Sequence, residues 1–150
     1  MTTRQKLLKP LQSLKKCLKG STSQAVDSQK NIGVIAEQAA LNYLLDQGLK
    51  AVQSNYFSRF GEIDLIMTDA QAVVFIEVRY RKYSSFGSAA MTVTKSKQQK
   101  LINTAKHYLQ EHQADVECRF DVIEMSPARL TSKQQQPSPF EIHWIKNAFM

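Results

Sequence analysis

The sequence has few of the features that mark secreted or membrane proteins. It contains two cysteines, Cys17 and Cys118, which have no metal-ligand spacing and form no disulfide framework, so we expect a reducing compartment. It has no run of eighteen apolar residues, and its first residues lack the apolar core and cleavage site of a signal peptide. These absences predict a cytoplasmic protein without a membrane span.

Several catalytic motifs are also missing. No glycine-rich phosphate loop occurs, which disfavours nucleotide hydrolysis by a P-loop mechanism. The histidines His107, His112 and His143 have no zinc-ligand spacing, and no nucleophilic triad is visible. The chemistry of the chain must therefore be sought in other polar residues.

Acidic residues are scarce at the start of the chain. Residues 1–30 hold seven basic side chains and one acidic side chain, a net charge of +6, whereas residues 31–150 hold 13 basic and 12 acidic side chains. We interpret residues 1–30 as a basic, flexible extension and residues 31–150 as one domain. Leucines at helical spacing leave three other roles open for the extension: a phosphate-backbone arm, a helix for a protein partner or a membrane-surface helix.

The pattern of apolar residues predicts two helices and five strands in the order α-β-β-β-α-β-β. The helices are expected from Asn31 to about Asp46 and from about Thr94 to His112. The strands are expected near residues 51–57, 60–67, 72–81, 119–125 and 140–145. This order predicts an α/β fold in which helices flank a central sheet.

Two acidic residues lie inside the most apolar strands. Asp64 stands between Ile63 and Leu65, and Glu77 follows four consecutive apolar residues. An ionised carboxylate in such a setting costs several kcal/mol unless a cation or hydrogen bonds compensate it. A divalent ion such as Mg²⁺ is one candidate for that cation, and Arg79 is the nearest alternative.

The spacing of these residues predicts one shared site. Because strand side chains alternate, Glu62 and Asp64 should share one face, and Glu77, Arg79 and Arg81 should share another. The polar residues 68–71 between the two strands are typical of a hairpin turn. A hairpin would place Asp64 and Glu77 on neighbouring strands, where one ion could bridge them.

Asp64 followed by Glu77-Val78-Arg79 resembles the D…(D/E)-x-K core of restriction-endonuclease-like nucleases, with Arg79 in the position of the lysine. Three segments, Gly33-x-x-Ala36-Glu37, Gly61-Glu62-Ile63-Asp64-Leu65 and Glu77-Val78-Arg79-x-Arg81, more specifically resemble the YraN-like family of bacterial proteins, which are similar to archaeal Holliday-junction resolvases. The resemblance covers roughly residues 31–125. It implies a restriction-endonuclease-like, mixed β-sheet flanked by helices.

The resemblance also implies a metal-dependent nuclease site. Its ligands for Mg²⁺ or Mn²⁺ would be Asp64, Glu77, Glu62 and Glu37, and Asp64, Glu77, Arg79 and Glu37 would be catalytic. The implied reaction is hydrolysis of DNA phosphodiesters, including branched or junction DNA. From the residues alone, Glu62 could instead face solvent or pair with an arginine, and Glu37 could be an ordinary solvated helix residue.

Basic residues around the predicted site suggest a nucleic-acid surface. They are Arg79, Arg81, Lys82, Lys95, Lys97 and Lys100. The aromatic residues Tyr80, Tyr83 and Phe86 are candidates for stacking on exposed bases. An ordinary solvated helix end is the alternative for the lysines. Two other functions stay open: a nucleic-acid-binding module with a degenerate nuclease site, and an adaptor that docks a partner protein through the extension. A homodimer also stays open.

Overall fold

The computed structural model describes residues 27–70, 72–82, 93–128 and 138–150, and the side chains of residues 27–30 are not among them. It contains seven elements. In chain order they are α1 (Asp27–Asp46), β1 (Lys50–Ser58), β2 (Gly61–Asp69), β3 (Ala72–Tyr80), α2 (Lys95–Glu111), β4 (Cys118–Pro127) and β5 (Phe140–Phe149). The predicted order α-β-β-β-α-β-β is therefore confirmed.

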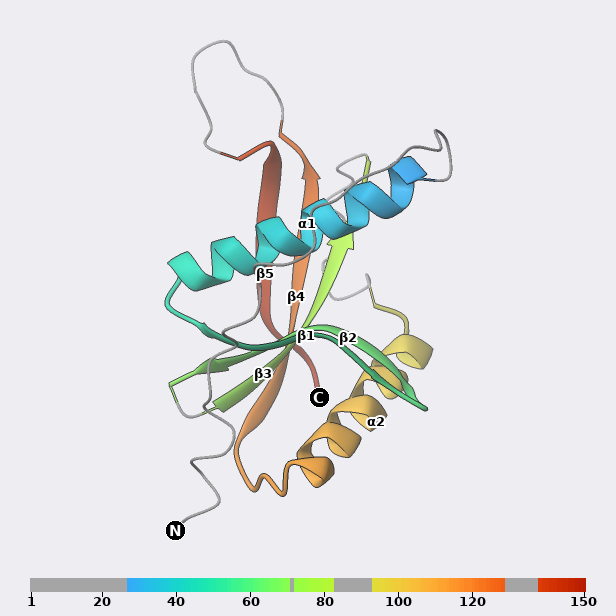
Figure 1. Cartoon of the computed structure of the whole chain (residues 1–150), viewed down its shortest axis with the longest axis vertical. Coiled ribbons are helices and arrows are strands. Elements are labelled where there is room, and N and C mark those ends of the chain that lie inside the picture. The colour runs from blue at the N-terminus through green and yellow to red at the C-terminus, as the bar shows by residue number, and fades with distance from the viewer. Residues whose placement is uncertain (1–26, 71, 83–92, 129–137) are drawn as a thin grey trace.

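The five strands form one mixed sheet in the order β1-β2-β3-β4-β5. Strands β3 and β4 are parallel, and α2 makes the crossover between them, whereas the other neighbouring strands are antiparallel. In Figure 1 the sheet is strongly twisted, with β4 and β5 running across the direction of β1 and β2. The two helices lie on opposite sides of this sheet (Figure 1).

Each face of the sheet has its own apolar core. Leu101, Ala105 and Tyr108 of α2 pack with one set of strand residues, which includes Ile63 and Phe75. The other core joins the inward side of α1 to the opposite strand residues: Ala36, Ala40, Leu41, Leu44, Leu65, Met67, Val74, Ile76, Ile123 and Met125. Burial of both faces explains why β2 and β3 are apolar almost throughout rather than alternating with polar residues.

Two element boundaries differ from the sequence prediction by more than two residues. Helix α1 begins at Asp27 rather than at Asn31, because no proline or glycine interrupts residues 27–31, so the helix starts inside the segment assigned to the extension. The rest of that extension, residues 1–26, lies outside the described residues. Strand β5 continues to Phe149 because the left-handed backbone of Asn147 (φ 49°) is held by an N–H bond to the Asp121 carboxylate.

Candidate functional site

Asp64 and Glu77 lie next to each other on β2 and β3. The antiparallel ladder pairs Leu65 with Ile76, so the next two residues outward are Asp64 and Glu77. Both carboxylates are buried, with exposed fractions of 9% and 5%. The Val78 N–H donates a hydrogen bond of 2.7 Å to Oδ2 of Asp64, which ties the two strands together beyond the last paired residues. The predicted proximity of the two carboxylates is confirmed.

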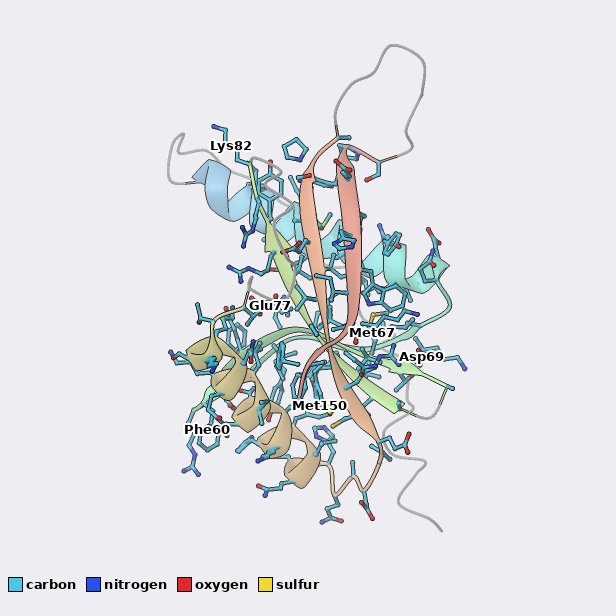
Figure 2. All side chains as sticks on the ribbon, turned by 180° about the vertical axis from the view of Figure 1, so that it is seen from behind. Phe60, Met67, Asp69, Glu77, Lys82 and Met150 are labelled. Atoms are coloured by element: carbon cyan, nitrogen blue, oxygen red, sulfur yellow. The ribbon has the colours of Figure 1, made fainter. Side chains whose placement is uncertain are left out.

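The cation at this site comes from α2. Nζ of Lys97 lies 2.5 Å from Oε1 of Glu77. The hydroxyl of Thr94, which caps α2, accepts the Lys97 N–H at 3.3 Å and so fixes the first turn of the helix beside β3. The other Glu77 oxygen, Oε2, is buried and has no hydrogen-bond partner within the described part of the chain. Figure 2 shows Glu77 near the end of the helix where Lys97 lies.

Glu37 of α1 approaches the same carboxylates from the opposite side of the sheet. Its side chain is half-buried and hydrogen-bonds to Asn55 of β1. Burial raises the pKa of Glu37, and the negative charges of Glu62 and Glu77 add to that rise, while the Asn55 hydrogen bond opposes it. Glu37 is therefore close enough to interact with the buried pair, as the resemblance implied.

Burial, together with the charges of the site, raises the pKa of Asp64 from 3.8 to about 7. Burial is the largest cause, and repulsion from Glu77 and Glu37 adds to it. The Val78 N–H and the Lys97 ammonium act in the opposite direction without cancelling it. The three carboxylates thus hold more negative charge than Lys97 neutralises.

Regular alternation along β2 breaks at Asp64. Ile63 packs in the core on the α2 side, whereas Leu65 packs in the core on the α1 side, although residues two apart on a regular strand share a face. The facing residue on β1 is Asn55, which has a left-handed backbone (φ 51°) and lies between the pairs Ser54–Leu65 and Tyr56–Ile63. The prediction that Glu62 and Asp64 share a face assumed regular alternation of side chains along β2. The structure does not have that alternation at Asp64, so the prediction loses its basis.

Glu62 lies at the edge of the site rather than within it. It is exposed and lines a pocket of about 380 Å³ between the β1–β2 hairpin and α2. The pocket is also lined by Phe57, Ser58, Gly61, Lys97, Lys100 and Leu101. Lys97 borders both this pocket and Glu77, so the two are adjacent.

The other basic residues of the prediction spread along the sheet. Arg79 is half-buried on β3, its Cα pairs with that of Glu124 on β4, and its guanidinium has no ion pair among the described residues. Arg81 is also half-buried, and Lys82 is exposed beyond the end of β3, well away from Glu77 in Figure 2. Lys95 and Lys100 are exposed on α2. The structure therefore brings Lys97 to Glu77 and Lys100 to the adjacent pocket, but leaves Lys82 away from the carboxylates.

The aromatic residues differ from those expected. Tyr80 packs against Phe140 in the core on the α1 side, so it does not offer a ring to a ligand beside Glu77. Tyr83 and Phe86 lie outside the described residues. The exposed ring at the site belongs to Phe57, which the sequence reasoning missed because a phenylalanine in a predicted strand is normally taken for core.

The donor atoms at the site suit a hard divalent cation. Asp64, Glu77 and Glu37 offer only carboxylate oxygens, the ligands that Mg²⁺ and Mn²⁺ prefer, and Oε2 of Glu77 is buried without a partner among the residues that the structure describes. Among the described residues, however, no group of three or more acidic, histidine or cysteine side chains is arranged to hold a metal ion. The chemistry of the residues fits a divalent ion, which Asp64 and Glu77 would hold if it bound.

Comparisons with known proteins agree with the family resemblance found in the sequence. Residues 36–125 match the model of the uncharacterised protein family UPF0102. A UPF0102 protein of Psychromonas ingrahamii is 51% identical over 117 residues, which span 78% of the chain and 88% of the relative. Another from Nitrosomonas europaea is 46% identical over 124 residues, spanning 83% and 98%. One from Coxiella burnetii is 45% identical over 121 residues, spanning 79% and 92%.

Proposed function

The chain belongs to the uncharacterised protein family UPF0102, the YraN-like family, and on that premise we propose that it is a metal-dependent endonuclease that hydrolyses DNA phosphodiesters, including those of branched or junction DNA. The observation that carries this proposal is the buried pair Asp64 and Glu77. Lys97 contacts one oxygen of Glu77, and the other oxygen, Oε2, has no partner among the described residues. We propose the cytoplasm as its place of action. No helix in the described parts of the chain is long and apolar enough to cross a membrane.

Burial without full compensation argues against a purely structural role for the two carboxylates. A structural acid in a protein core normally has partners for both oxygens, because an unpaired buried oxygen costs roughly 1–3 kcal/mol or more. Within the described part of the chain, Oε2 of Glu77 is such an unpaired oxygen, and the pKa of Asp64 is raised rather than lowered. Both observations favour a site that accepts additional positive charge.

In the reaction, water attacks phosphorus, one P–O ester bond breaks, and the leaving oxygen takes a proton. A divalent cation bound by Asp64 and Glu77 would supply an acidified water and neutralise phosphate charge. Lys97 can donate hydrogen bonds to a non-bridging phosphate oxygen from its place beside Glu77. Arg79 is free of ion pairs among the described residues and can make a bidentate contact with phosphate.

A second candidate function is a nucleic-acid-binding module with a degenerate site. It is favoured by two contacts that occupy the carboxylates in this structure: the Val78 N–H on Asp64 and the Lys97 ammonium on Glu77. In this case Arg79 and the lysines hold phosphates, and the carboxylates form structural contacts only. Loss of cleavage with retained binding distinguishes this candidate from the endonuclease.

The proposal is tested with labelled single-stranded, duplex, flap and four-way-junction DNA, each incubated with and without Mn²⁺. We expect Mn²⁺-dependent cleavage that prefers the branched substrates. Binding without cleavage of any substrate supports the second candidate. Calorimetric titration with Mn²⁺ separates the endonuclease from an adaptor protein, because the endonuclease should bind the ion and Glu77→Gln, which removes one hard ligand, should weaken that binding.

A further inference from the structure

The described part of the chain exposes two aromatic rings, and both lie at one hairpin. Phe57 is 66% exposed near the end of β1, and Phe60 is 36% exposed in the turn that leads to β2. Burial of a phenylalanine ring favours folding, so the fold gives up stability by leaving Phe57 in water. An exposed ring beside a charged pocket is typical of a binding surface.

The pocket at Phe57 combines a ring with cations. Its volume of about 380 Å³ lies within the usual range of small-ligand pockets, roughly 300–1,000 Å³. Lys97 and Lys100 line one part of it, close to the N-terminal end of α2, whose first turn contains no acidic residue. Lys97 stands in the first turn, where the helix dipole repels a cation, and it contacts Glu77. Lys100 lies beyond the first turn and has no ion pair among the described residues. Two ammonium groups that line one pocket suit an anionic ligand.

The hairpin holds Phe57 in a fixed place. The Ser58 hydroxyl accepts the Phe60 N–H at 3.1 Å, and the Phe60 ring packs edge-on against His107 of α2. In Figure 2, Phe60 lies beside this helix. Tyr56, the residue before Phe57, is buried, and its hydroxyl bonds with both His107 and Glu111. The ring of Phe57 is thus presented by a rigid frame, which lowers the entropy cost of binding.

The ring also has a polar neighbour. Glu62 is paired with Phe57 across the hairpin and lines the same pocket. Its carboxylate can accept a hydrogen bond from an N–H group on the edge of a base, and it repels phosphate toward the lysines. The pocket therefore offers an aromatic face, a hydrogen-bond acceptor and two cations, which match the base and the phosphate of one nucleotide.

We propose that this pocket binds one unpaired nucleotide of a single-stranded segment of nucleic acid, with its base stacked on Phe57 and its phosphate at Lys97 and Lys100. A base inside a duplex has both faces covered and cannot reach the ring, whereas an unpaired base can. Because Lys97 also contacts Glu77, the unpaired nucleotide lies next to the carboxylates. This placement rests on the proposed endonuclease function. It defines the substrate class as nucleic acid with an unpaired segment beside the cleaved phosphate.

The test measures fluorescence anisotropy of labelled oligo-dT, oligo-U and a blunt duplex of equal length, all in EDTA so that no metal-dependent cleavage occurs. The variants are Phe57→Ala and Phe57→Trp, together with Lys100→Gln. Their controls are Val34→Ala, an exposed apolar residue of α1, and Lys106→Gln, an exposed lysine of α2 that does not line the pocket. The oligo-dT and oligo-U arms show whether the pocket takes DNA or RNA.

We expect Phe57→Ala to weaken single-strand binding about tenfold, since base–aromatic stacking is worth about 1–3 kcal/mol, and to change duplex affinity less than twofold. Phe57→Trp should retain single-strand affinity, and Lys100→Gln should weaken it more than Lys106→Gln does. Equal single-strand affinity for wild type and Phe57→Ala overturns the pocket while leaving the endonuclease intact, provided that wild type binds duplex or junction DNA. Absence of wild-type binding to every nucleic acid overturns both proposals.

Discussion

The ammonium of Lys97 on α2 contacts the carboxylate of Glu77 on β3, with 2.5 Å between Nζ and Oε1. Nineteen residues of chain, including the segment 83–92 that lies outside the described residues, separate the two. This ion pair joins the crossover helix to the middle of the sheet and satisfies one of the two Glu77 oxygens. It also marks the point where the nucleotide pocket and the carboxylate site meet.

Removing the amine should destabilise the protein. Lys97→Met leaves the Glu77 carboxylate buried without its cation, but Lys97 is 42% exposed, so solvent reduces the loss to about 1–2 kcal/mol. Glu77→Gln in the same chain should recover much of it. The free energy of unfolding by urea, with the exposed Lys106→Met as control, measures the effect. Equal stability of Lys97→Met and Lys106→Met would show that the ion pair does not contribute.

The stability of the metal-free protein should depend on Asp64 between about pH 4 and pH 7. Its pKa is raised from 3.8 to about 7 in the folded state, so folding favours the protonated acid, and stability is lost as the pH rises through this window. Asp64→Asn can still accept the Val78 N–H but carries no charge. At pH 8 we expect the variant to be more stable than wild type, by on the order of 2–4 kcal/mol.

Thermal and urea unfolding of wild type and Asp64→Asn at pH 4, 6 and 8, in EDTA, tests this pH dependence. The difference between the two proteins should grow with pH. Asp64→Asn would instead be less stable than wild type at every pH if the ionised carboxylate were a structural group that the fold requires.

The sequence predicted the parts of the site that depend on local pattern. Asp64 and Glu77 stand out because a carboxylate inside an apolar strand is costly, and the hairpin between them fixes their proximity. The sequence did not predict the partner of Glu77. Lys97 reaches it only through the packing of α2 on the sheet, and no pattern within the helix separates Lys97 from Lys95 or Lys100.

Other parts of the site depend on backbone details that sequence periodicity does not contain. The break in alternation at Asp64 arises opposite Asn55, whose left-handed conformation is common for asparagine but is not required by it. Glu37 lies on a half-exposed part of α1, where a glutamate is usually solvated, so only the resemblance singled it out. The Asn55–Glu37 hydrogen bond links these two features.

Arg79 gives a prediction that separates cleavage from binding. If the protein is a nuclease, Arg79→Lys should retain or increase cleavage, because lysine keeps the charge, whereas Arg79→Ala should abolish it. If the protein only binds, Arg79→Lys should weaken binding by about 1 kcal/mol through loss of the bidentate phosphate contact. Cleavage rates and affinities for a four-way junction, measured for the three proteins, decide between these patterns.

The basic extension should contribute to nonspecific affinity. Residues 1–26 hold six basic and no acidic side chains, so deleting them lowers the net charge from +7 to +1 while leaving α1 whole. Fewer counterions are then released on DNA binding, and the slope of log affinity against log salt concentration should flatten. Titration of duplex DNA between about 50 and 200 mM salt measures the slope. An unchanged slope would assign the extension to a different partner.

The central claim is that Asp64 and Glu77 form a metal-dependent phosphodiesterase site. Its most direct test is the initial rate at which a labelled four-way junction is cleaved in Mn²⁺ by wild type, by Glu77→Gln and by the control Glu141→Gln. Glu141 is an exposed glutamate of β5. The account predicts cleavage by wild type and Glu141→Gln that EDTA abolishes. It predicts a rate at least about a hundredfold lower for Glu77→Gln, because loss of an outer-shell partner of a metal site already costs about 10–100-fold and loss of a direct ligand should cost more. Cleavage by Glu77→Gln at the wild-type rate, or no cleavage by any of the three proteins, would contradict it.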